Sequence, residues 1–254
     1  MKTIILAGGF GTRLAEETEL RPKPMVEIGD KPILWHIMRS YASHGFREFV
    51  VALGYKGEYI KRFFWDYYNL SRDLTVDLGT GRVEQRGGIA EDWKVHLCNT
   101  GLNTMTGGRI WRVRDLVRGE RFMLTYGDGV TDANIADIVE FHKRHGKIAT
   151  VLAVRPPSRF GGLEFDGDLV SNFIEKPQIG EGWINGGFMV FEPAVLEYLV
   201  DDTTKLEQDV LETLAAKRQL AAYRHTGFWQ CMDTLRDKHV LEQLWREGRA
   251  PWMP

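Results

Sequence analysis

The chain has 254 residues, a length that accommodates one large α/β domain or two small ones. Hydrophobic residues make up 43% and charged residues 27%, so the chain can bury an ordinary globular core without disulfides or a structural metal. The formal net charge of −2 argues against a nucleic-acid-binding protein, for which a basic excess is expected.

The N-terminal segment predicts a buried strand that leads into a glycine-rich loop. Residues 3–7 form an apolar run that is typical of a strand covered on both faces. The run is too short for a signal peptide or a membrane span, so we expect a cytoplasmic protein with no membrane partner. The two cysteines, Cys98 and Cys231, have no CxxC neighbour, so neither a disulfide framework nor a zinc site is expected.

Alternating helices and strands follow in the first half of the chain. A helix is predicted to open at Pro32, because proline suits a first helical turn, and to stop near Gly45. Further strands are predicted at residues 49–53, 122–125 and 148–154, and further helices at 57–70 and 134–145. This order is the signature of parallel βαβ units with right-handed crossovers.

Two other regions have a different pattern. Residues 73–108 are richer in Gly, Asn and Thr, and we interpret them as short strands and loops laid over the sheet edge. After residue 159 we expect antiparallel strands at 163–165, 169–174 and 187–191, then two helices at 206–217 and 234–246. The predicted fold is therefore an α/β, Rossmann-like, mostly parallel mixed sheet flanked by helices, with a more antiparallel C-terminal half. No repeat or linker interrupts it, so residues 1–254 are predicted to form a single domain.

The loop after the first strand is a candidate phosphate site. Three glycines, Gly8, Gly9 and Gly11, allow backbone N–H groups to approach a ligand closely. Arg13 adds a fork of donors suited to a polyphosphate, and Lys23, between two prolines, can counter charge on a phosphorus. The segment matches neither the dinucleotide fingerprint nor the P-loop. Since Gly-Gly turns also occur without a ligand, a purely structural turn remains the alternative.

Two distant aspartates are candidates for a magnesium site. Asp128, in the segment Tyr126-Gly127-Asp128-Gly129, follows a predicted buried strand, at the sheet edge where α/β proteins bind ligands. Asp233 lies between a predicted strand and the last helix. Two carboxylates together with substrate phosphates suit the octahedral demand of Mg²⁺. The alternatives are a turn residue for Asp128 and a helix N-cap for Asp233; Asp132 fits the role of N-cap for the helix that begins near residue 133.

These motifs together resemble those of the sugar-1-phosphate nucleotidylyltransferases, and the resemblance extends over nearly the whole chain. Its signature is the segment Gly8-Gly9-Phe10-Gly11-Thr12-Arg13-Leu14 followed by Lys23. The common form has Pro and Thr before the lysine, whereas this chain has Ala15-Glu16-Glu17-Thr18-Glu19-Leu20-Arg21-Pro22, which is similar to the cytidylyltransferase branch. The resemblance implies transfer of CMP from CTP to glucose 1-phosphate with Mg²⁺, giving CDP-glucose, a precursor in surface-polysaccharide synthesis. It also implies a nucleotide-binding half at about 1–155 and a sugar-binding half at about 156–254.

The resemblance assigns roles residue by residue. The nucleotide is expected on Leu6, Ala7, Gly8, Gly9, Phe10, Gly11, Thr12, Arg13, Lys23 and Asp128, with its triphosphate on residues 8–13. The metal is expected on Asp128 and Asp233, and Lys23, Arg13 and Asp128 are expected to be catalytic. The base is expected at Thr104 and Arg109. The sugar phosphate is expected at Gly161, Glu175, Lys176 and Asn185. For Arg109 a solvated first-turn position, and for Glu175 and Lys176 a surface ion pair, remain the structural alternatives.

Two rival functions remain open at this stage. One is a thymidylyl- or uridylyltransferase, although the Gln-Pro-x-Gly-Leu-like stretch of those relatives is missing. The other is a non-catalytic nucleotide-sugar-binding subunit, which would be expected to lose Lys23 or a metal aspartate. The resemblance also implies a homo-oligomer, and the aromatic run at residues 63–68 is interpreted as helix packing or a subunit contact rather than a surface for nucleic acid.

Overall fold

The computed structural model describes residues 1–88, 91–156, 162–166, 169–174 and 182–253. Within these ranges the core is a seven-stranded sheet. In spatial order its strands are β14 (Leu220–His225), β10 (Ala149–Val154), β13 (Ile184–Phe191), β8 (Phe122–Tyr126), β1 (Thr3–Ala7), β4 (Glu48–Leu53) and β7 (Lys94–Asn99). β13 is antiparallel to both of its neighbours, whereas the other pairs are parallel. The predicted mostly parallel mixed sheet is therefore confirmed, and it takes strands from both halves of the chain.

Helices cover both faces of this sheet, and the side chains of β1 are divided between two hydrophobic clusters, one on each face. Ile5 and Ala7 belong to one cluster, and Ile4 and Leu6 belong to the other, as the alternation of side chains along a strand requires. The first cluster packs on α2 (Ile33–Ser43), α3 (Gly57–Leu70), α5 (Ile135–His145) and α7 (Leu235–Arg246). The second packs on α4 (Thr106–Val113), on a π-helical turn, η5 (Leu206–Leu211), and on α6 (Glu212–Ala216). No described helix is long and apolar enough to span a membrane.

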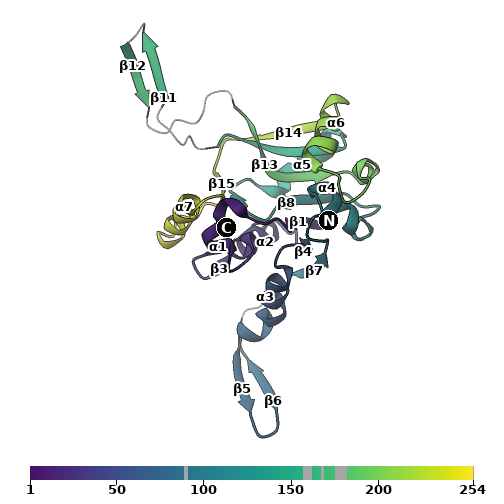
Figure 1. The fold of residues 1–254 in the computed structure, drawn as a ribbon, viewed down its shortest axis with the longest axis vertical. Coiled ribbons are helices and arrows are strands. Elements are labelled where there is room, and N and C mark those ends of the chain that lie inside the picture. The colour runs from purple at the N-terminus through teal and green to yellow at the C-terminus, as the bar shows by residue number, and fades with distance from the viewer. Residues whose placement is uncertain (89–90, 157–161, 167–168, 175–181, 254) are drawn as a thin grey trace.

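Two ribbons extend from the body of the molecule at opposite ends (Figure 1). The first, β5 (Asp73–Asp77) and β6 (Arg82–Arg86), continues from α3 and is almost wholly exposed. The prediction that this region lies over the sheet edge was therefore wrong for the ribbon, although β7 does form that edge. The second, β11 (Gly162–Asp166) and β12 (Leu169–Ile174), confirms the predicted antiparallel pair.

Both helix caps proposed for aspartates were wrong. The side chain of Asn134, rather than Asp132, accepts hydrogen bonds from the backbone N–H groups of Ala136 and Asp137 at the start of α5. Thr234, rather than Asp233, caps α7 in a capping box with Asp237.

The remaining elements are short. They are η1 (Thr12–Leu14), α1 (Ala15–Thr18), η2 (Lys23–Met25), β2 (Glu27–Ile28), β3 (Lys31–Pro32), η3 (Arg114–Leu116), β9 (Gly129–Thr131), η4 (Pro193–Tyr198) and β15 (Trp229–Cys231). The antiparallel pair β9–β15 matters most, because Cys231 lies opposite Gly129 in its register. This pairing brings the segment after Tyr126 to the segment before α7.

Candidate active site

The two predicted metal aspartates both contact the predicted catalytic lysine. Lys23 Nζ lies 2.6 Å from Asp128 Oδ2 and 2.5 Å from Asp233 Oδ1. The lysine side chain is only 11% exposed, and those of the two aspartates are 30% and 16% exposed. The structure thus brings together three charged groups that are remote from one another in the sequence.

Local backbone chemistry explains the position of Lys23. It begins the short helix η2 after Pro22, which lies in the extended region, and Val26 N–H closes the turn on the Lys23 carbonyl. Pro24, Met25 and Val26 are buried, so the turn is anchored in the core. Gly11 has a positive φ of 68°, and a Cβ there would lie 3.2 Å from Lys23 Cβ, so the glycine loop packs directly against the lysine.

Asp128 and Asp233 meet because of hydrogen bonding between β9 and β15. Asp128 lies in the turn between β8 and β9, and its carbonyl accepts a hydrogen bond of 2.8 Å from Met232 N–H. Asp233 follows β15 and precedes α7. Gly127 leaves room for this arrangement, because a Cβ there would lie 2.9 Å from Pro24 Cγ.

The electrostatics of the cleft favour a cation. Burial lowers the pKa of Lys23, but Asp128, through its charge and a hydrogen bond, and Asp233 outweigh burial and raise the lysine pKa above its ordinary value. Burial, together with the charges of Asp233 and Asp128, raises the pKa of the neighbouring Cys231 thiol to about 12. Cys231 is therefore a neutral thiol at neutral pH and not a candidate nucleophile.

A cavity of about 610 Å³ opens beside these groups. Its walls include the predicted nucleotide-binding residues Leu6, Ala7, Gly8, Gly9, Phe10, Gly11 and Thr12, together with Lys23, Asp128 and the predicted base residues Thr104 and Arg109. Gly9 faces open space, since a Cβ there would meet nothing within 4 Å. The glycine loop thus borders a space large enough for a nucleotide.

Arg109 is buried, and its guanidinium is hydrogen-bonded to oxygen atoms of the protein. The alternative of a solvated first-turn position was therefore wrong. Arg109 Nη1 donates to the Leu53 and Gly101 carbonyls and to the Thr100 hydroxyl, and its Nη2 donates to the Gly8 and Leu102 carbonyls. The guanidinium therefore ties the phosphate loop to the 100–102 loop. Contact with a base remains a prediction.

Only one of the four residues predicted to bind the sugar phosphate lies within the described residues. Asn185, at the start of β13, is exposed, and its Oδ1 accepts a hydrogen bond of 2.9 Å from Gly187 N–H. Gly161, Glu175 and Lys176 lie outside the described residues, and so does the side chain of Arg13. Their roles remain predictions.

Sequence reasoning missed several residues that line the cavity, namely Asn103, Met105, Thr106 and Tyr126. Tyr126 had a usable signal, because it ends a buried strand directly before Gly127-Asp128. Thr106 had one too, because it lies two residues after the predicted base residue Thr104. Glu207 had none, although its carboxylate accepts hydrogen bonds from the hydroxyls of both Tyr126 and Thr106.

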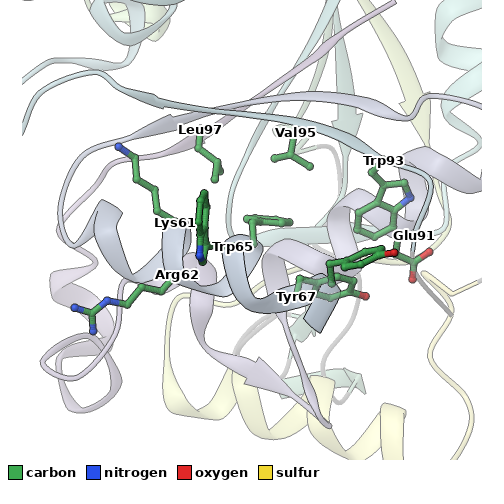
Figure 2. A pocket seen from close by; sticks show the side chains of 10 residues that line it. Lys61, Arg62, Trp65, Tyr67, Glu91, Trp93, Val95 and Leu97 are labelled. Carbon is green, nitrogen blue, oxygen red and sulfur yellow. The ribbon is translucent and has the colours of Figure 1, made fainter. Parts of the chain in front are cut away.

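A second cavity, of about 560 Å³, lies between α3 and β7 and is lined mainly by aromatic and aliphatic side chains. Figure 2 shows Trp65 and Tyr67 of α3 facing Trp93, Val95 and Leu97. Trp65 is 83% exposed, so the predicted helix packing does not account for this side chain. The walls carry none of the phosphate-loop residues.

Comparisons with known proteins agree with this geometry. The nucleotidyl transferase family model matches residues 2–234. Glucose-1-phosphate cytidylyltransferase of Salmonella typhi is 51% identical over 253 residues, covering 99% of this chain and 98% of that protein. Mannose-1-phosphate guanylyltransferase catalytic subunit beta of Danio rerio is 32% identical, covering 90% of this chain and 60% of that protein. The structure of HddC from Yersinia pseudotuberculosis complexed with GMP-PN aligns with a TM-score of 0.68 at 23% identity, over 96% of this chain and 99% of that chain, and supports the fold.

Proposed function

Because the chain belongs to the nucleotidyl transferase family, we propose that it transfers CMP from CTP to glucose 1-phosphate, forming CDP-glucose and pyrophosphate. The structural observation that carries this proposal is the Lys23 ammonium between the Asp128 and Asp233 carboxylates, beside a glycine-lined cavity. Identity of 51% to a glucose-1-phosphate cytidylyltransferase over nearly the full length of both proteins supports the nucleotide and the sugar.

The reaction is an in-line displacement. An oxygen of the sugar phosphate attacks the α-phosphorus of CTP, the bond from that phosphorus to the bridging oxygen of the β-phosphate breaks, and pyrophosphate leaves. The attacking oxygen is already anionic, so no general base is needed. Catalysis then depends on alignment and on neutralisation of charge at phosphorus. Lys23 donates from its ammonium to the α-phosphate, and the backbone N–H groups of the glycine loop hold the outer phosphates.

The two aspartates suit a divalent cation. Their oxygens already converge on one positive group, the Lys23 ammonium, at 2.6 and 2.5 Å. The described residues contain no group of three or more His, Cys, Asp and Glu side chains fit to hold a metal, so the remaining ligands would come from substrate phosphates and water. Mg²⁺ held by Asp128 and Asp233 would supply Lewis-acid neutralisation of the reacting phosphates.

The rest of the site divides between the two substrates. Thr104 is buried at the wall of the cavity and is suited to a base or ribose contact. Arg109 fixes the loop that carries Thr104. Asn185, together with Gly161, Glu175 and Lys176, would receive the sugar phosphate, and Arg13 would bind the β- and γ-phosphates. The cytoplasmic location remains a prediction.

A nucleotide screen tests the proposed function. Pyrophosphate release would be measured with glucose 1-phosphate and, in turn, CTP, dTTP, UTP and GTP. We expect CTP to be preferred by a wide margin. Preference for dTTP or UTP would identify the protein as a thymidylyl- or uridylyltransferase. No turnover with any nucleotide would favour a non-catalytic nucleotide-sugar-binding subunit.

We further propose that the protein is a homo-oligomer that uses the α3 and β5–β6 face. In the β5–β6 register Val76 lies opposite Val83, so these two side chains share one face of the ribbon with Leu74. Asp73, Thr75 and Asp77 point to the other face. An isolated two-stranded ribbon is marginally stable in water, so the apolar face is expected to be covered by a second copy.

A further inference from the structure

We propose that Glu207 is a positioning residue. Its carboxylate sets the orientation of Asn185 toward the sugar phosphate, and it also holds in place the loop that carries Thr104, called here the base loop. This inference rests on the proposed function, because it takes Asn185 and Thr104 as substrate contacts. Glu207 is half-buried on the π-helical turn η5 and lies outside every motif recognised in the sequence. Single π turns occur frequently at functional sites.

The two oxygens of Glu207 reach two different walls of the cavity. Oε1 accepts a hydrogen bond from the Tyr126 hydroxyl, at the end of β8. Oε2 accepts a hydrogen bond of 2.7 Å from the Thr106 hydroxyl, at the start of α4, and Thr106 Oγ1 in turn accepts one of 2.9 Å from Leu206 N–H. Tyr126 and Thr106 both line the cavity. Hydrogen bonds to a charged acceptor are the stronger kind, so the carboxylate is an effective anchor.

On the sugar side Tyr126 is linked to Asn185 through Gly187. The Tyr126 hydroxyl has a single hydrogen, which it donates to Glu207, so it can only accept from its remaining neighbours. Asn185 Oδ1 accepts a hydrogen bond of 2.9 Å from the N–H of Gly187, the residue against which the Tyr126 ring packs. This bond orients the Asn185 amide with its oxygen toward Gly187 and its nitrogen away from it.

Gly187 makes this contact sterically feasible. Its φ is +83°, and a Cβ there would lie 2.6 Å from Tyr126 Cδ2. The tyrosine ring therefore packs directly on the backbone of β13. A side chain at this position would push the ring away from Gly187, whose N–H holds Asn185.

On the nucleotide side Glu207 belongs to a segment that supports the base loop. Met105 N–H donates to the Asp202 carbonyl at 2.9 Å, and Gly108 N–H donates to the Thr204 carbonyl at 3.0 Å. Cβ atoms on Gly107 and Gly108 would lie 2.8 and 2.5 Å from the Thr204 and Asp202 carbonyl oxygens. The glycine pair thus lets α4 sit directly on the segment that leads into the π turn.

The test compares Glu207→Gln, Tyr126→Phe and the double variant with Glu212→Gln, the same substitution at an exposed position just after the π turn. We expect each single variant to raise the KM for glucose 1-phosphate about tenfold, the loss expected for one hydrogen bond to a charged group, while kcat changes much less. The double variant should be no worse than the singles, because both break one chain. Glu212→Gln should match the wild type.

A second readout needs no substrate. Deuterium exchange at the Gly187 amide, the far end of the chain, should accelerate in Glu207→Gln and in Tyr126→Phe but not in Glu212→Gln. Multiplicative losses in the double variant, an unchanged sugar-phosphate KM or unchanged Gly187 exchange would each overturn the proposal. If the wild type does not use CTP or glucose 1-phosphate, the proposed function fails instead. The KM values are then measured with the nucleotide and sugar phosphate that the enzyme does use. The exchange rate of the Gly187 amide still decides the role of Glu207. If Glu207→Gln does not fold, Tyr126→Phe alone carries both measurements.

Discussion

Gly8 and Arg109 are in direct contact, and the absence of a side chain on Gly8 is what allows it. Arg109 Nη2 donates to the Gly8 carbonyl at 3.0 Å, and a Cβ on Gly8 would lie 2.2 Å from Nη1 of the same guanidinium. The glycine loop and the loop at residues 100–102 therefore share one buried cation. Displacing that cation should disturb both loops at once.

Gly8→Ala is accordingly expected to damage the site and the fold together. Overpacking of a buried contact costs about 1–3 kcal/mol, so thermal unfolding should begin several degrees lower, and the KM for CTP should rise. The matched control is Gly9→Ala, because a Cβ on Gly9 meets nothing within 4 Å and should leave the unfolding temperature unchanged. Equal unfolding temperatures for the two variants would contradict the packing argument.

Lys23→Ala is expected to reduce kcat strongly while the protein stays folded. Loss of one donor aimed at transition-state charge costs about 10²–10³-fold in kcat, measured here as pyrophosphate release. Lys205→Ala, a lysine-to-alanine change at an exposed residue, serves as the control. Wild-type turnover by Lys23→Ala would remove this lysine from the mechanism.

Asp233→Asn is expected to weaken the response to magnesium. With one of two charged oxygen ligands neutralised, the concentration of Mg²⁺ that gives half-maximal activity should rise about tenfold or more. Chelation of divalent ions should abolish wild-type activity, and added Mg²⁺ should restore it. Asp66→Asn, at an exposed position on α3, should keep the wild-type response. Activity that persists in excess chelator would exclude the metal role.

The Cys231 thiol is expected to resist alkylation. Burial and the nearby Asp233 and Asp128 charges raise its pKa to about 12, and only the thiolate reacts. At about pH 8, where an ordinary cysteine is partly ionised, the rate of carbamidomethylation at Cys231 should be at least about tenfold below that of a free cysteine.

The same pKa shift bears on stability. The folded-state pKa is raised above the unfolded value, so the stability linked to this thiol is fully present below about pH 8.5 and decreases as pH rises toward 12. Cys231→Ser should remove this part of the alkaline loss, seen in unfolding curves recorded across that interval. Fast alkylation of Cys231 in the native wild type would contradict the raised pKa of this thiol.

A charge on the exposed apolar face should disrupt self-association. Trp65 is 83% exposed and Leu78 is 91% exposed, on α3 and in the loop of the β5–β6 ribbon. Trp65→Glu and Leu78→Glu should lower the molecular mass measured by sedimentation, because a buried unpaired charge is costly. Leu169→Glu, at another apolar residue that is 75% exposed but on the β11–β12 ribbon, is the control. A wild-type protein that sediments as a monomer would contradict the oligomer.

Local pattern was sufficient for most elements. The apolar run at residues 3–7, the helix at 57–70 and the glycine loop were predicted where the structure has them, since side-chain periodicity and turn residues act over a few positions. Errors came where two local signals competed. Asp132 and Asn134 both precede α5, and Asn134 takes the cap.

The sequence by itself determined the buried strands, the mixed sheet and the candidates Lys23, Asp128 and Asp233, because those features depend on residue type and near neighbours. Only the tertiary structure decided that the two acids meet on one ammonium, through the β9–β15 pairing. Only the tertiary structure decided that the Arg109 guanidinium donates to loop carbonyls, and that Glu207 accepts hydrogen bonds from residues on two walls of the cavity. Such contacts link residues far apart along the chain, and their geometry is set by packing and strand register, which no local pattern encodes.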